Sequence, residues 1–86
     1  MKLKYKFELM DLGEQVIALT IEEDANHYRN VIKMNQSGAA IFKLLEHNTS
    51  EQEIFYNLSQ EYDNSDCIRD FVHDFIIALD NAGVLL

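Results

Sequence analysis

The hydrophobic pattern of this 86-residue chain changes its period near residue 35, and no other feature of the sequence constrains the fold as much. Before that point apolar and polar residues alternate, which is the period-two pattern of strands with one buried face. We expect strands over residues 5–9, 16–21 and 31–34, with a turn at Gly13 and a polar loop over residues 22–28.

After residue 35, apolar residues recur every three to four positions, which is the spacing of helices that bury one face. The first predicted helix begins after Asn35 or Ser37, either of which could cap it. The second begins after Thr49 or Ser50, and each of these stands three residues before a Gln or Glu, as in a capping box. A break at residues 63–65 separates it from the third helix and offers the next cap.

The third predicted helix carries a broad apolar arc and ends at residue 81 or 82, before a left-handed Gly83. The arc comprises Ile68, Phe71, Val72, Phe75, Leu79 and Ala82, with Ile76 and Ala78 at its edges. It fits a well-buried helix, or a helix with one edge lining an open groove. The sequence leaves open which edge that is, Phe71 with Ala78 or Ile76 with Arg69.

Strands first and helices after predict an α+β fold, winged-helix-like, with a three-stranded antiparallel sheet followed by three helices. Residues 1–86 form a single domain, because a chain this short cannot build a second core. Its 15 acidic and 7 basic residues give a net charge of −8, which repels nucleic acid and anionic membranes. One cysteine and no apolar run long enough to span a bilayer predict a cytoplasmic protein without disulfides.

No set of residues suited to catalysis or to a cofactor can be assembled from the sequence. Asp70, His73 and Asp74 share one helix face near Cys67, but no paired Cys or His spacing accompanies them, and a solvated polar face explains them. Ser37 lacks the motif of a nucleophile elbow. We therefore expect no enzyme activity, no metal and no cofactor.

Four short segments carry a resemblance to a known family. They are N-Q-S-G-A-A-I-F at residues 35–42, T-S-E-Q-E-I at 49–54, E-Y-D at 61–63 and F-V-x-x-F-I-x-x-L-x-x-x-G-V-L at 71–85. In order and spacing the chain resembles the PqqD family of pyrroloquinoline quinone biosynthesis peptide chaperones. Such domains are also called recognition elements of RiPPs, the ribosomally made and post-translationally modified peptides. One departure is Phe71, where the family usually carries an aspartate.

The resemblance implies a non-catalytic domain that binds the leader segment of a precursor peptide. In this family the leader adds as a strand to the third strand, beside the third helix, and is presented to a modifying enzyme. That partner would be a radical SAM enzyme or a protease and cyclase pair. The expected binding residues come from the edge over residues 28–34 and from the helix wall: Tyr28, Arg29, Asn30, Val31, Ile32, Lys33, Arg69, Phe71, Val72, Phe75 and Ile76.

Charge suggests a further property of this site. Arg29 and Lys33 are four residues apart and would project from one face of a continuous strand. Together with Arg69 they would flank the groove, either to attract an acidic leader or only to keep an edge strand soluble.

Two other functions fit the same architecture. A winged-helix DNA-binding regulator needs Lys or Arg facing the phosphates, whereas the last two predicted helices hold only Arg69. A regulatory subunit derived from a domain once fused to an enzyme would co-purify with that enzyme.

Overall fold

The sheet is antiparallel and has three strands. The computed structural model describes residues 1–62 and 65–86, and the strands are β1 (Phe7–Asp11), β2 (Val16–Thr20) and β3 (Ile32–Met34). Their order in the sheet is β1-β2-β3, so β1 and β3 are the two edges.

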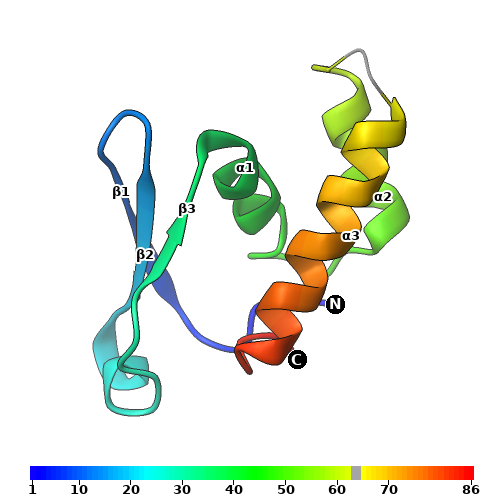
Figure 1. Ribbon diagram of the computed structural model, residues 1–86. Helices are drawn as coiled ribbons and strands as arrows, with labels where there is room; N and C mark the ends of the chain where they lie inside the picture. The colour runs from blue at the N-terminus through cyan, green and yellow to red at the C-terminus, as the bar shows by residue number, and fades with distance from the viewer. Residues whose placement is uncertain (63–64) are drawn as a thin grey trace.

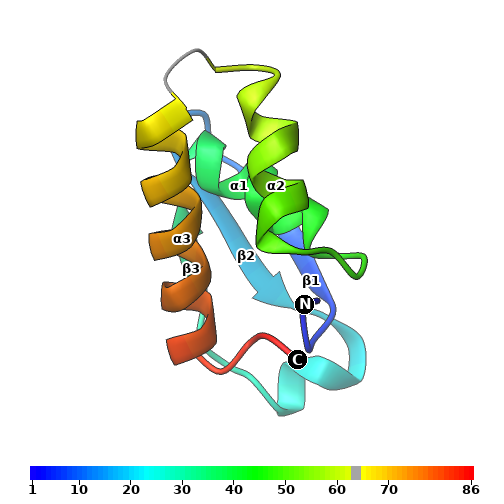
Figure 2. The same cartoon turned by 90° about the vertical axis from the view of Figure 1, so that its right-hand side faces the viewer.

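Three helices follow the sheet, α1 (Gln36–Leu44), α2 (Glu51–Ser59) and α3 (Ser65–Asn81), and all of them lie on one side of it (Figure 1). A view turned by 90° shows that α2 and α3 run side by side in opposite directions in front of the sheet (Figure 2). The predicted α+β architecture is confirmed. None of the helices among the described residues is long and apolar enough to cross a bilayer.

The helix ends follow local sequence signals. Asn35 caps α1 by accepting a hydrogen bond from the backbone N–H of Gly38 at 2.8 Å, and Ser50 caps α2 by accepting one from Glu53 at 3.1 Å. Gly83, with φ of 77°, ends α3 as predicted, because only a residue without Cβ adopts this conformation freely. The predicted cap at residues 63–65 lies outside the side chains that the structure describes.

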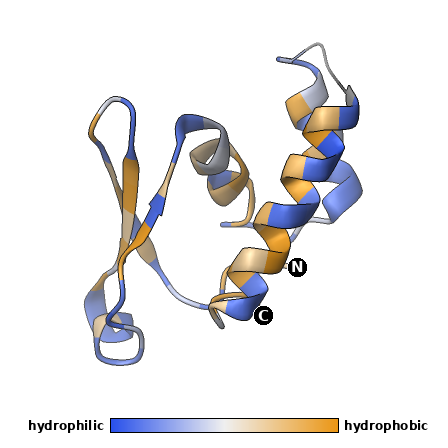
Figure 3. Cartoon of the chain, in the orientation of Figure 1, coloured by the Kyte–Doolittle hydropathy of each residue, from blue (hydrophilic) through white to orange (hydrophobic). Residues whose placement is uncertain are grey.

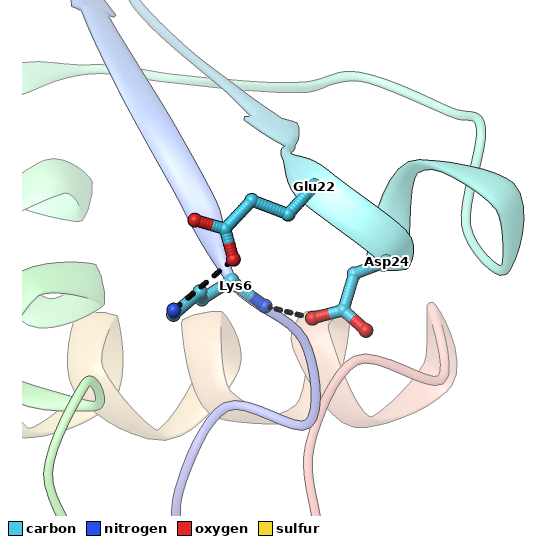
Figure 4. Close-up of polar contacts among 3 residues, drawn as sticks. All are labelled: Lys6, Glu22 and Asp24. Atoms are coloured by element: carbon cyan, nitrogen blue, oxygen red, sulfur yellow. Dashed lines mark hydrogen bonds and ion pairs between the residues drawn. The ribbon is translucent and has the colours of Figure 1, made fainter.

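The segment between β2 and β3 differs from the prediction. Residues 22–28 contain a short 3-10 helix, η1 (Glu22–Asn26), in place of an irregular loop. Asp24 accepts a hydrogen bond from the backbone N–H of Lys6 at 2.7 Å, and Glu22 pairs with the Lys6 ammonium at 3.1 Å (Figure 4). These contacts fasten η1 to the start of β1, so the chain re-enters the sheet only at Ile32.

One hydrophobic core lies between the sheet and the helices. It is built from the buried residues Val16 and Ala18 of β2, Ile41 and Phe42 of α1, and Val72 of α3, among others. Apolar and polar residues alternate along α3, in keeping with a helix that buries one side (Figure 3). Burying each large apolar side chain contributes about 1.5–3 kcal/mol, so this hydrophobic core is the main source of the domain's stability.

Candidate functional site

One edge of α3 faces α2. The guanidinium of Arg69 lies over the ring of Phe55 in α2, 4.7 Å from its centroid. One turn further, His73 Nδ1 is 3.1 Å from Glu51 Oε1, also in α2. Ile76 follows along the same edge and is buried. The Ile76–Arg69 edge of the arc is therefore the one that holds α3 to α2.

The opposite edge of α3 faces the junction of β3 and α1. Phe71 and Phe75 are half-buried and stack on each other with their ring centroids 6.0 Å apart. A Cβ added to Gly38 would lie 2.8 Å from a ring carbon of Phe75 and 3.2 Å from Cβ of Met34, the last residue of β3. Glycine at position 38 thus lets the Phe75 ring reach α1 and the end of β3.

A pocket of about 310 Å³ opens at the amino-terminal end of this same edge. Its walls are mainly apolar, and the lining residues are Asn35, Ser37, Leu58, Tyr62, Cys67, Ile68 and Phe71. Ser37 Oγ and Tyr62 Oη lie 3.4 Å apart and supply polar groups among these residues. Such a pocket suits a large apolar side chain that has a polar atom at its tip.

A larger hollow, of about 900 Å³, lies elsewhere on the molecule. It is lined by Lys2, Leu3, Lys4, Tyr5, Lys6, Phe7, Ile21, Glu22, Glu23, Asp24, Glu46 and His47. Neither β3 nor α3 contributes to it, and the Lys6–Glu22 pair already joins two of its charges. The smaller pocket and the adjoining edge of α3 are therefore the candidate site.

The β3 strand offers a free backbone edge. Its pairing is with β2, through Ile32 opposite Ala18 and Lys33 opposite Ile17, and none of the described residues pairs with its other side. Val31 is 51% exposed, and Lys33 is exposed as well. An exposed edge of this kind can pair with an added strand.

The expected binding residues fall into two groups in the structure. Ile32 and Lys33 of β3 and Phe71 and Phe75 of α3 belong to the elements that border the site. Exposed Arg29, Asn30 and Val31 lead into β3 but precede its first residue, so the period-two argument does not extend to Arg29.

The second group packs elsewhere. Tyr28 stacks on Tyr5, with ring centroids 5.6 Å apart, and its carbonyl accepts a hydrogen bond from the Thr20 hydroxyl. Val72 is fully buried, while Arg69 and Ile76 lie on the α2 side of α3. The pocket residues Ser37, Leu58, Tyr62 and Cys67 were not anticipated from the sequence. No local pattern marks them, because the pocket forms only where α1, α2 and α3 meet.

Residues 9–85 match the sequence model of the PqqD family, described as coenzyme PQQ synthesis protein D. The chain belongs to the PqqD family. Among solved structures, that of TbiB1 in complex with the TbiA(beta) leader peptide matches with a TM-score of 0.71 and 22% sequence identity. The match covers 99% of this chain and 94% of TbiB1, and it confirms the fold. A comparison with curated proteins gives no match.

Proposed function

We propose that this PqqD-family domain binds the leader segment of a precursor peptide as a fourth strand along the free edge of β3. The apolar side chains of the leader pack on Phe71 and Phe75 of α3, and the bound peptide is presented to a modifying enzyme. The observation that carries the proposal is the free edge of β3 together with a stacked aromatic pair of α3 that is only half-buried. The leader peptide bound in the TbiB1 structure supports it.

Side-chain anchors must supply most of the affinity. Strand β3 has only 3 residues, so an added strand gains few backbone hydrogen bonds. Each such bond contributes a net of about 0.5–1.5 kcal/mol. One large apolar side chain contributes about 1.5–3 kcal/mol when fully buried. We propose that the pocket beside Phe71 takes one apolar or aromatic side chain of the leader and thereby selects the peptide.

The domain acts as a binding module and not as an enzyme, and its place is the cytoplasm, which a single cysteine fits. The partner is a radical SAM enzyme or a protease and cyclase pair acting on the bound peptide. A DNA-binding role is disfavoured by the exposed surface of α3, which carries Asp66, Asp70, Asp74 and Asp80.

Nuclear magnetic resonance on the labelled protein tests the proposal, with synthetic leader segments of candidate precursor peptides as the probes. We expect shifted amide signals at Ile32 and Lys33 and shifted side-chain signals at Phe71 and Phe75. Tyr56, 66% exposed on α2, serves as an internal control that should not respond. No change at millimolar peptide, or changes confined to α2, would contradict the proposal.

A further inference from the structure

The outer face of the sheet, turned away from the helices, is apolar. Met10 and Leu12 are 48% and 59% exposed, and Ile17 and Leu19 of β2 project from the same face and are half-buried. Val31 beside β3 is exposed as well. We call this surface the outer patch: Met10, Leu12, Ile17, Leu19 and Val31.

The described helices do not cover the outer patch. They lie together on the other side of the sheet (Figure 1). Half-buried Phe7, Leu9 and Ile32 pack against the core, whereas Ile17 and Leu19 are outside that cluster among the described residues. An antiparallel sheet that leaves one face to solvent commonly carries polar residues on that face, so apolar residues there call for a partner.

Two unpaired charges of opposite sign flank the patch. The register places Glu8 opposite Leu19 and Lys33 opposite Ile17, so these charges stand on different edge strands and in different rows of the sheet. Both are exposed, and the salt bridges found among residues 1–62 and 65–86, Lys6–Glu22 and His73–Glu51, leave them without an ion-pair partner. The patch is thus locally neutral in a chain of net charge −8.

We infer that the outer patch is a self-association surface that binds a second copy of this chain face to face. A two-fold axis in the plane of the patch, perpendicular to the Glu8–Lys33 diagonal, brings each Glu8 opposite the partner's Lys33. The same axis stacks Ile17 and Leu19 on their counterparts. Two-fold contacts require this kind of self-complementarity, and sheets commonly pack face to face about 10 Å apart.

The contact is weak and depends on concentration. Three strands span about 10 Å across, and five residues span about 17 Å along the strand. That footprint is far below the roughly 800 Å² that each partner buries in a stable complex. We therefore expect the dimer only at high protein concentration. It uses the Lys33 side chain of β3 but leaves the backbone edge of that strand and the Phe71–Phe75 side of α3 outside the contact.

Sedimentation equilibrium from micromolar to millimolar protein tests the inference. The average mass should rise from the monomer value of 10.0 kDa toward twice that value. Glu8→Lys and Lys33→Glu should each weaken association at least several-fold by placing like charges opposite each other. The double variant Glu8→Lys/Lys33→Glu should restore it.

Matched controls are Glu61→Lys and Lys43→Glu, which make the same charge changes at exposed positions outside the patch. They should associate as the wild type does. A mass that stays at the monomer value up to millimolar protein overturns the inference and leaves the patch to a different protein. Single variants that associate like the wild type, or a double variant that stays weak, also overturn it.

Discussion

The two edges of α3 differ in how their side chains are held, although they share one helix. On the α2 edge, Arg69 covers the Phe55 ring and His73 meets Glu51, so these side chains already have partners within the molecule. On the β3 edge, Phe71 and Phe75 stack on each other and pack against the core, yet both stay only half-buried. The first edge stabilises the domain, whereas the second keeps apolar surface that a ligand can cover.

This difference removes an ambiguity of the apolar arc. The apolar arc of α3 is wider than one packing contact needs, so either of its two edges could have faced the candidate site. The contacts of Arg69 and of Gly38 with their aromatic neighbours assign one margin to α2 and the other to the β3–α1 junction. The binding surface that we propose is therefore narrower than the arc and consists of Phe71, Phe75 and the pocket beside them.

The largest expected effect is at Val72, between the two edges. This side chain is fully buried, so Val72→Asp places a carboxylate in the core and destabilises the domain by several kcal/mol. Loss of helical circular dichroism or a large fall in melting temperature should accompany the loss of peptide binding. A folded Val72→Asp variant that selectively fails to bind would show that Val72 lines the site instead.

The two edges of α3 are tested separately by removing Phe75, on the β3 edge, and Phe55 of α2, which contacts the other edge. Phe75→Ala should weaken leader binding by up to about 1.5 kcal/mol, or roughly 10-fold, because the half-buried ring gains only part of the ~1.5–3 kcal/mol that full burial of such a side chain contributes. Phe55→Ala, its matched control on α2, should lower the melting temperature with little change in affinity. Isothermal titration calorimetry with the cognate leader measures both. Equal losses of affinity in the two variants would contradict the assignment of the edges.

A feature of the fold or of the candidate site could be predicted from the sequence only where the interactions that determine it are local. The caps at Asn35 and Ser50 and the end at Gly83 rest on hydrogen bonds within a few residues, and their prediction succeeded. The start of β3, in contrast, is not determined by a local signal. The contacts of Asp24 and Glu22 with Lys6 divert the chain, so strand propensity at residue 31 was overridden.

The sequence did not predict which edge of α3 faces the candidate site, nor which residues line the pocket, because both depend on contacts between separate elements. Arg69 and Phe55 are adjacent only because α2 and α3 pack side by side. Helical spacing gives the angle of each residue around α3, but it does not give the position of α2. The free edge of β3 could be anticipated, since the family resemblance implied it, whereas the residues lining the pocket come from α1, α2, α3 and the segments next to them.

Gly38→Ala tests whether Phe75 must lie where it does. The added Cβ would stand 2.8 Å from the Phe75 ring, so the ring has to move. Alanine also favours a helix over glycine by about 0.5–1 kcal/mol, which offsets part of the packing cost. We expect a melting temperature within a few degrees of the wild type and a several-fold loss of leader affinity. Unchanged affinity would show that the position of this ring does not matter for binding.

The smallest effects concern charge, and they separate Arg69 from Arg29 and Lys33. Arg69 lies on Phe55, so Arg69→Ala should cost about 0.5–1 kcal/mol of stability and leave leader binding unchanged. Arg29 and Lys33 are exposed beside the free edge of β3, and reversing both charges should slow the association of an acidic leader and flatten its dependence on salt. Association rates at two ionic strengths distinguish the two cases. If Arg69→Ala alone reduces the salt dependence, the positive charge that attracts the leader lies on α3 and not on β3.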